Sequence, residues 1–404
     1  MKVPHLSENV VEAWTSHLCT LAKKASLFPS TEKTQMLASL LSDNGVTDLQ
    51  FRSDSHVRLQ TAHGLELVER FGRLSPLDLV EISLLLLRCR NYGDGAEESS
   101  PTDEFIRRMT AERSIEFSCE GGHFSDGLPS HCRLRVQCFL DVTGIGITAR
   151  RLHDYPQELE LLGFGDETVL HLQSLLSRNS GLCLVTGQTG AGKSTTLAAM
   201  LHWQRSHFPR HIVTVEDPIE YRFSDQQSDG RVFPSLVTQQ EVGTHVDSFR
   251  QGLIDALRKH PHVIMMGEIR DRQTMGTVLE AIQTGHLVLS TLHTRGAAST
   301  IRRVLEFFEP AERDAILSQL SEALLFVLSQ GLFPSSRNPK EQILCYEFLQ
   351  NDSNESRSAI RKYADNPTIL SDCLTRKSNR RWMDSLNALV DDGLVARQHL
   401  SGVE

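Results

Sequence analysis

The sequence lacks features that mark several special classes of protein. None of its eight cysteines belongs to a C-x-x-C pair, so a zinc ribbon is not expected. The densest apolar stretch, Ile82–Leu87, covers only six residues and is far too short to span a membrane. The N-terminal segment contains no apolar signal core. These absences predict a cytoplasmic protein without a transmembrane segment, whose thiols stay free in a reducing compartment.

An excess of basic charge is also missing. The chain carries 42 Lys and Arg against 51 Asp and Glu, which gives a net charge of −9. Proteins that bind nucleic acid directly usually present a basic surface with interleaved aromatic rings. No direct nucleic-acid binding is therefore expected. The 404 residues, of which 39% are hydrophobic, are enough for two or three domains with cores of their own.

What the sequence does contain is a complete phosphate-binding loop. Residues Gly187–Ser194 read G-Q-T-G-A-G-K-S and lie between an apolar run, Leu182–Val185, and a helix-like segment. The glycines let backbone N–H groups turn inward around an anion, and the helix adds its positive end. Lys193 can reach the outer phosphates of ATP, and the Ser194 hydroxyl can hold Mg²⁺. The predicted nucleotide-binding residues are Gly187, Gln188, Thr189, Gly190, Ala191, Gly192, Lys193, Ser194 and Thr195.

Two acidic segments downstream can supply more of a hydrolytic site. The apolar residues before Glu216 predict a buried strand that ends at this carboxylate and Asp217. The run Val263–Met266 leads likewise into Gly267 and Glu268, as in a Walker B strand with glycine at the usual aspartate position. Acids at the carboxyl ends of strands in an open α/β sheet face the ligand crevice. Glu268 is therefore expected to act on Mg²⁺-bound water or on the attacking water.

A third segment, Thr284–Thr294, predicts a strand flanked by two histidines. His286 and His293 are seven residues apart, which corresponds to about 20 Å in an extended strand at about 3.3 Å per residue. They cannot share one metal ion, so we expect them to have different roles.

The order of these segments resembles the secretion and pilus ATPases of the type II/type IV superfamily. That family has a Walker A loop, an Asp box, a Walker B and a His box, which here correspond to the loop, E-D-P-I-E, G-E-I-R-D and T-G-H-L-V-L-S-T-L-H-T. The stretches L-L-G-F-G, Q-Q-E-V-G and S-F-R-Q-G-L-I-D-A-L-R-K-H-P are similar to PilT-type pilus retraction ATPases and to the DotB/TraJ-type ATPases of type IVB secretion and conjugation. One departure is Ile254, where the family usually has arginine.

The resemblance implies a homohexamer that hydrolyses ATP with Mg²⁺ and powers a pilus or secretion machine. It implies peripheral docking at the inner membrane through platform or secretion-machine proteins. Mg²⁺ would be held by Ser194 and, partly through water, by Glu268. His293 would contact or sense the γ-phosphate, whereas His286 would be structural. The catalytic residues implied are Lys193, Glu216, Glu268 and His293.

The family also has arginines in its N-terminal domain that approach the nucleotide. Three arginines stand at the corresponding positions here, and they are Arg133, Arg135 and Arg150. Arg133 and Arg135 lie on one face of a predicted strand, and these two equally fit a solvated strand face.

The expected fold is α/β and has three parts. Residues 1–155 are predicted to form an α+β PAS-like domain with a helical lead at 1–40. Residues 156–334 are predicted to form a RecA-like P-loop domain, because helix and strand patterns alternate there. Residues 335–404 are predicted to form a small helical region, and the polar segment Asn91–Thr102 to be a loop.

Two other functions remain open at this point. One is a RecA-like motor that acts on DNA, against which the acidic charge counts. The other is a nucleotide-gated scaffold that turns over too slowly to act as a motor. Within the resemblance itself, pilus retraction, type IVB secretion and conjugation are not separated.

Overall fold

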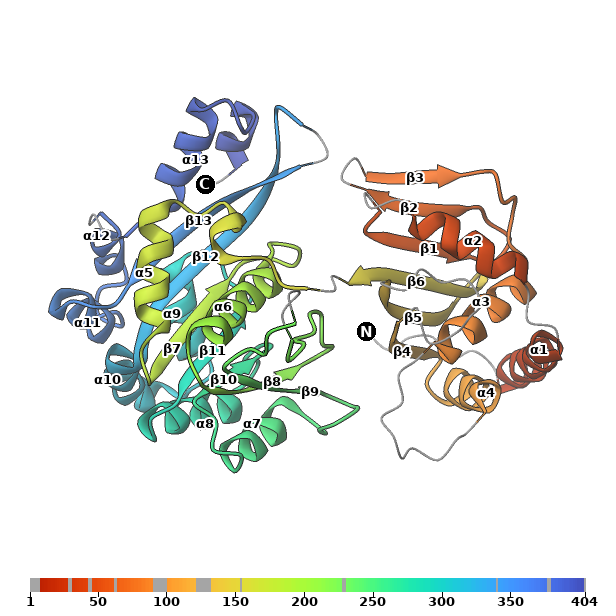
Figure 1. Ribbon diagram of the computed structural model, residues 1–404, viewed down its shortest axis with the longest axis horizontal. Coiled ribbons are helices and arrows are strands. Elements are labelled where there is room, and N and C mark those ends of the chain that lie inside the picture. The colour runs from red at the N-terminus through yellow and green to blue at the C-terminus, as the bar shows by residue number, and fades with distance from the viewer. Residues whose placement is uncertain are drawn as a thin grey trace. The chain divides into compact units, whose positions relative to one another are not determined.

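The chain divides into two compact units, Met1–Asp154 and Tyr155–Glu404 (Figure 1). The computed structural model describes residues 8–27, 31–42, 46–61, 64–89, 100–120, 132–152, 155–226, 230–338, 341–375 and 379–402. Within these residues, none of the helices is both long and apolar enough to cross a bilayer. Most of the polar segment at 91–102 lies outside this described part.

The first unit is an antiparallel sheet of six strands in the order β3-β2-β1-β6-β5-β4. Its strands are β1 (Asp48–Arg52), β2 (Val57–Thr61), β3 (Gly64–Val68), β4 (Ser114–Glu120), β5 (Arg133–Asp141) and β6 (Gly144–Leu152). Its helices are α1 (Glu8–Leu27), α2 (Thr31–Leu41), α3 (Pro76–Arg88) and α4 (Pro101–Ala111). The helical lead expected at 1–40 corresponds to α1 and α2, whereas α4 was not expected.

Alternating side chains of this sheet have opposite surroundings. Leu49, Phe51, Val136 and Ile147 are fully buried or nearly so, and they join the helices in one apolar cluster. The residues between them, such as Gln137, are exposed or half-buried. One buried and one polar face is the usual pattern of an antiparallel sheet.

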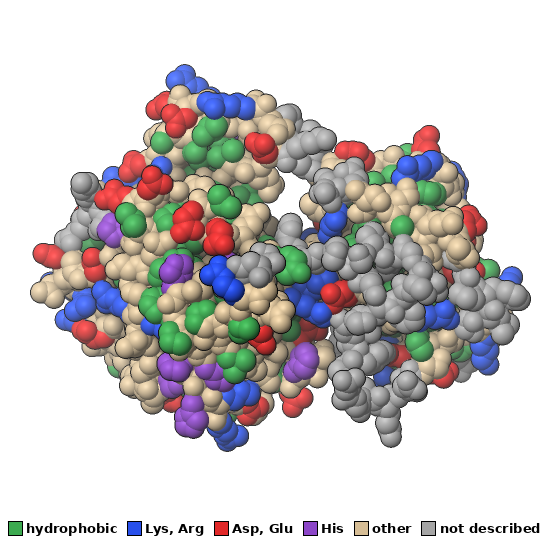
Figure 2. All heavy atoms as spheres, viewed as in Figure 1, with side chains coloured by type: hydrophobic (Ala, Val, Ile, Leu, Met, Phe, Trp, Pro, Cys, Tyr) green, Lys and Arg blue, Asp and Glu red, His purple; other side chains and the backbone are tan. Residues whose placement is uncertain are grey.

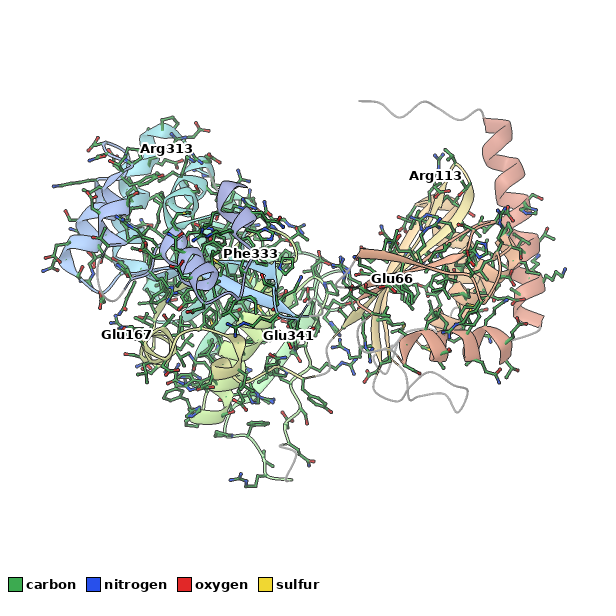
Figure 3. The ribbon with its side chains drawn as sticks, turned by 90° about the horizontal axis from the view of Figure 1, so that it is seen from above. Glu66, Arg113, Glu167, Arg313, Phe333 and Glu341 are labelled. Atoms are coloured by element: carbon green, nitrogen blue, oxygen red, sulfur yellow. The ribbon has the colours of Figure 1, made fainter. Side chains whose placement is uncertain are left out.

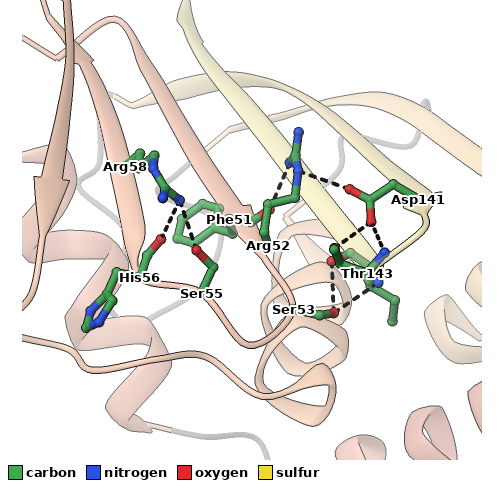
Figure 4. A network of polar contacts seen from close by, with 9 residues as sticks. Phe51, Arg52, Ser53, Ser55, His56, Arg58, Asp141 and Thr143 are labelled. Atoms are coloured by element: carbon green, nitrogen blue, oxygen red, sulfur yellow. Dashed lines mark hydrogen bonds and ion pairs between the residues drawn. The ribbon is translucent and has the colours of Figure 1, made fainter.

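A polar network holds the turns at one end of this sheet (Figure 4). Arg52 lies 3.3 Å from Asp141, and its guanidinium group lies over the Phe139 ring, 4.4 Å from the centroid. Gly146 leaves room for this stack, because a Cβ there would lie 2.7 Å from the Phe139 ring. Ser53 exchanges hydrogen bonds with the backbone of Ile145. The network therefore fixes β1 against the β5–β6 turn.

The second unit is built on a seven-stranded sheet in the order β13-β12-β7-β11-β10-β8-β9. All neighbours are parallel except β12 and β13. The strands are β7 (Gly181–Thr186), β8 (His211–Glu216), β9 (Leu236–Glu241), β10 (Val263–Met266), β11 (Leu287–Leu292), β12 (Leu324–Pro334) and β13 (Gln342–Gln350). The central strands are buried on both faces, and β8 and β10 are the strands predicted by the apolar runs before the acidic motifs.

Helices cover both faces of this sheet (Figure 1). One face carries α5 (Asp166–Leu176) and α6 (Lys193–His207). The other face carries α7 (Phe249–Leu257), α8 (Arg272–Gln283), α9 (Ala297–Glu306), α10 (Arg313–Ala323), α11 (Asn354–Arg361) and α12 (Ile369–Cys373). This is the α/β architecture predicted for the segment 156–334.

The expectation for residues 335–404 is partly wrong. Gln342–Gln350 is not helical but forms β13, the antiparallel edge strand paired with β12. Its side chains are nearly all buried, and Glu347 is the one charged residue in the otherwise apolar run Ile343–Leu349. After it come α11, α12 and α13 (Trp382–Asp391), and α13 packs on the strand pair through Trp382 and Leu386. Phe333 of β12, labelled in Figure 3, lies 6.3 Å from the Trp382 ring.

Candidate active site

The phosphate loop joins β7 to α6, as predicted. Three of its residues, Gly187, Gly190 and Gly192, have φ angles of +148°, +79° and +82°. Only glycine adopts such angles without strain, so these positions allow the backbone to curl around an anion. Gly192 forms the N-cap of α6, and the positive end of this helix therefore faces the loop.

Lys193 is the first residue of α6, and its side chain returns along the loop. Its Nζ atom donates hydrogen bonds to the carbonyl oxygens of Gly187 at 3.0 Å and Gln188 at 2.9 Å. Burial lowers the pKa of Lys193, whereas the nearby charges of Glu268 and Glu220 raise it. The ammonium group thus lies within the loop and within the field of the Walker B acid.

Glu216 ends β8, and it is the residue to which the buried strand was predicted to lead. It is 8% exposed, and its Oε1 accepts hydrogen bonds from the Thr214 hydroxyl at 2.6 Å and from the Gln239 side chain at 3.1 Å. Beyond it, Tyr221 lies 2.8 Å from the hydroxyl of Thr195 in the first turn of α6. The segment after β8 is therefore tied to the helix that carries the phosphate loop.

Glu268 follows β10 and pairs with two basic groups. Arg270 forms an ion pair with its Oε1, and this hydrogen bond raises the pKa of Arg270. His293 Nε2 lies 3.5 Å from its Oε2. The Glu268 side chain is 18% exposed, whereas that of His293 is 52% exposed, so the pair opens to solvent on the histidine side.

Gly267 and its surroundings hold the Walker B segment in place. The Gly267 amide donates to Val215 of β8 at 2.8 Å, and its carbonyl accepts from the Thr291 hydroxyl of β11 at 2.7 Å. A Cβ at Gly267 would lie 3.1 Å from the Phe249 ring of α7. This close approach is a physical reason for glycine at the position where aspartate is usual. Arg270 also lies over the Phe249 ring, 5.7 Å from its centroid.

The two histidines have different surroundings, as expected. His286 precedes β11, and its Nδ1 lies 2.9 Å from the Ala281 carbonyl near the end of α8. His293 follows β11, at the other end of the strand. Burial lowers the pKa of His293, and so do the charges of Lys193 and Arg270, while Glu268 raises it. Of the two histidines, His293 is therefore the one that lies in the electrostatic field of Lys193 in the phosphate loop.

Lys193, Glu268 and His293 therefore come together beyond the carboxyl ends of three neighbouring parallel strands. Such an edge is where open α/β sheets bind their ligands. Two residues that contribute here were not expected from the sequence. One is Arg270 of the quoted G-E-I-R-D motif, and the other is Gln239, the first residue of the quoted Q-Q-E-V-G stretch.

The donors at this edge suit a hard cation. Ser194, Glu216 and Glu268 offer hydroxyl and carboxylate oxygens, which are the ligands that Mg²⁺ takes together with water and phosphate oxygens. In the described part of the chain, no group of three His, Cys, Asp or Glu side chains is placed to hold a metal ion by itself.

The three arginines of the first unit lie on β5 and β6. Arg135 and Arg150 face each other across the two strands, and each pairs with an acid. Arg135 binds Glu116, and Arg150 Nε donates to Asp48 at 2.7 Å. Arg133 differs because it is only 4% exposed. A solvated strand face thus describes Arg135 and Arg150 but not Arg133.

Comparison with known proteins finds similar sequences and similar solved structures. The twitching motility protein of Neisseria gonorrhoeae is 37% identical over 275 residues, which cover 68% of this chain and 70% of that protein. The crystal structure of the pilus retraction motor PilT with bound ADP aligns with a TM-score of 0.73 at 28% identity, over 90% of this chain and 94% of that one. The Legionella pneumophila ATPase DotB shares the fold, with a TM-score of 0.70 at 22% identity over 98% and 96% of the two chains.

These similarities agree with the predicted P-loop fold. The family described as Type II/IV secretion system protein matches residues 120–382, which is more than half of the chain. The match includes the phosphate loop, both acidic segments and the strand between the two histidines. The chain belongs to the type II/IV secretion system protein family.

Proposed function

We propose that this chain is the motor subunit of a pilus or secretion machine, and that it works as a homohexamer with Mg²⁺. As a member of its family the chain is an ATP-hydrolysing enzyme. The observation that carries the proposal is the convergence of Lys193, Glu268 and His293 beside the phosphate loop. Docking at the cytoplasmic face of the inner membrane, through platform or secretion-machine proteins, belongs to the same proposal.

Each side chain has a role that follows from its position. The backbone amides of Gly187–Ser194 would bind the phosphates, and Lys193 would neutralise their outer charge. Mg²⁺ would be held by Ser194 and, through water, by Glu268, and would supply positive charge at the phosphates. Glu268 and Glu216 would orient water, and His293 would contact the γ-phosphate. Arg133, Arg135 and Arg150 are proposed to complete the site from the first unit.

The catalytic role of Glu268 is tested by Glu268→Gln, which keeps the shape of the side chain and removes its charge. We expect kcat for ATP hydrolysis to fall about 100-fold or more, as is typical when a group that acts on the nucleophile is lost. The affinity for ADP should change little, since the phosphate loop is intact. The matched control is Glu280→Gln, an exposed acid on α8, which should leave both quantities unchanged. Wild-type turnover by Glu268→Gln would refute this assignment.

A motor that acts on DNA is the competing function. On the face viewed in Figure 2, basic and acidic side chains of the second unit lie interspersed. This favours a protein partner over a polyanion. Hydrolysis that is stimulated by DNA and declines with rising salt would instead support the DNA motor.

A further inference from the structure

The phosphate loop has a neighbour that the sequence motifs do not include. Strand β12 pairs in parallel with β7, and Ser329 stands beside Thr186, the last residue of β7. The next residue, Gln330, therefore accompanies the start of the loop. Its side chain is 3% exposed, and its Nε2 donates a 2.7 Å hydrogen bond to the carbonyl oxygen of Ala191.

Both the backbone and the side chain of Gln330 lie close to the phosphate loop. A Cβ on Gly187 would lie 2.3 Å from the Gln330 carbonyl oxygen, and a Cβ on Gly192 would lie 3.1 Å from its Nε2. Two glycines of the loop thus face the same residue of β12. Gln330 fills the space that their missing side chains leave.

The hydrogen bond from Gln330 sets the direction of a loop amide. In a trans peptide the C=O and N–H groups point in opposite directions. Because the Ala191 carbonyl is held toward β12, the Gly192 N–H is directed away from β12, where it can face a phosphate. The amide orientation of Gln330 is itself fixed, since a flipped side chain would place its oxygen against the Ala191 oxygen.

The oxygen of the Gln330 side-chain amide has unusual surroundings. Gln330 Oε1 is buried and has no hydrogen-bond partner among the described residues. An unsatisfied buried acceptor is costly and rare in proteins. An apolar side chain of equal length would avoid this cost, so the amide at this position needs a reason other than packing.

We propose that Gln330 is a positioning residue for the phosphate loop, which it holds in the conformation that binds nucleotide. It acts through the Ala191 carbonyl and touches none of the groups assigned to catalysis. This inference rests on the proposed function, because it assumes that the loop binds ATP.

The test is Gln330→Met, which keeps the length of the side chain and removes the donor. We expect KM for ATP and Kd for ADP to rise about tenfold, the effect of one lost hydrogen bond and one unsatisfied carbonyl. At saturating ATP, kcat should stay within about twofold, since Glu268 and His293 are untouched. Gln330→Asn, whose amide is one methylene too short, should behave in the same way.

A matched control separates positioning from packing. Gln350 of β13 is also buried, at 6% exposure, and its Oε1 also has no partner among the described residues, but its Nε2 donates to Asp352. Gln350→Met should leave KM and Kd unchanged, because the Gln350 amide donates to Asp352 and not to the phosphate loop. If Gln330→Met and Gln330→Asn keep the wild-type KM, or if Gln350→Met raises it equally, the inference is wrong.

The proposed function is checked separately with Lys193→Ala. If Lys193→Ala leaves ADP binding unchanged, the assignment of the loop fails, whatever the Gln330 variants do. If Lys193→Ala weakens ADP binding and the Gln330 variants do not, only the role of Gln330 fails. For any variant that does not fold, hydrogen exchange of the loop amides in the remaining Gln330 variant provides the readout, and exchange faster than in the wild type is expected.

Discussion

The eight cysteines show what burial does to single residues. Seven of the eight thiols are buried, and only Cys19 is partly exposed. Burial raises the pKa of Cys89 and Cys345 to about 11 and that of Cys138 to about 12. A thiol reacts as its thiolate, so these groups are unreactive near neutral pH.

We therefore expect a thiol reagent such as DTNB to titrate about one cysteine per native chain at pH 8, because only Cys19 is both accessible and unburied. All eight should react in denaturant. The released chromophore gives the count directly. Rapid reaction of several thiols in the native protein would show that the buried cysteines are accessible, contrary to the structure.

Among single residues, the side chains of the candidate nucleotide site were more predictable than Gln330, the residue that contacts the phosphate loop from β12. Lys193 was found from its place in the phosphate-loop motif, and Glu216 and Glu268 were found because they follow apolar strand patterns; both signals are local in the sequence. Gln330 lies 139 residues from the Ala191 carbonyl that it contacts, so only the parallel pairing of β12 with β7 brings them together. No spacing rule could have indicated it.

At the scale of elements, the effect of an alanine substitution in the loop between β7 and α6 depends on which glycine is replaced. Gly187→Ala places a Cβ 2.3 Å from the Gln330 carbonyl oxygen, a backbone atom that cannot move aside. Gly190 has open space around it, so Gly190→Ala meets only the strain of a positive φ, about 1–2 kcal/mol. We expect Gly187→Ala to weaken ADP binding more than tenfold and more than Gly190→Ala, as measured by calorimetry. Equal effects would mean that β12 does not constrain the loop.

Strand β13 is joined to two helices by one acid. Glu347 accepts a 2.7 Å hydrogen bond from the amide of Ala297, the first residue of α9, and a further one from the amide of Trp382, the first residue of α13. Both helices therefore begin at the same carboxylate, which also suits their positive ends. Burial nevertheless raises the pKa of Glu347 above its ordinary value of 4.5.

This raised pKa predicts how stability changes with pH. The folded state binds the proton more tightly than the unfolded state, so the stability from protonated Glu347 is present below about pH 4.5 and is lost as pH rises through the folded pKa. Glu347→Gln does not titrate and can still accept a hydrogen bond. We expect the free energy of unfolding of the variant to improve relative to wild type between pH 4.5 and 8, in urea titrations. A difference that stays constant with pH would contradict this.

Two elements show different limits of sequence reasoning. Helix α4 was missed although Ser100, Pro101 and Asp103 are typical of a helix start, so its signal was present. Strand β13 had an ambiguous signal. Residues Ile343–Leu349 are apolar except for Glu347, and a short apolar run without alternation fits a strand buried on both faces or a buried helical segment. Its pairing with β12 shows that it is a strand.

At the scale of the whole molecule, the proposed role of the arginines of the first unit in ATP hydrolysis can be tested. Arg135 and Arg150 share the polar face of the first unit, and both are already bound to acids there. If arginines of this unit complete the nucleotide site as proposed, then Arg150→Gln should lower kcat/KM for ATP at least about tenfold, because an arginine at the transferred phosphate supplies much of the catalysis in related reactions.

The control for Arg150 is Arg58→Gln on the same sheet. Arg58 donates to the Ser55 hydroxyl at 2.9 Å and belongs to the network at the end of the sheet (Figure 4). Its loss should leave hydrolysis unchanged. A normal kcat/KM for Arg150→Gln would remove this arginine from the proposed site.

Strand β12 meets a separate requirement at each of three consecutive positions. The Ser329 hydroxyl accepts a 2.8 Å hydrogen bond from the Gly296 amide before α9, Gln330 holds the phosphate loop, and Gly331 leaves room for the Trp382 ring, which would lie 2.8 Å from a Cβ. The apolar residues before them, Phe326–Leu328, need only fill a core. In a library of every single substitution, we therefore expect Phe326–Leu328 to accept other apolar residues. Ser329, Gln330 and Gly331 should accept almost no replacement.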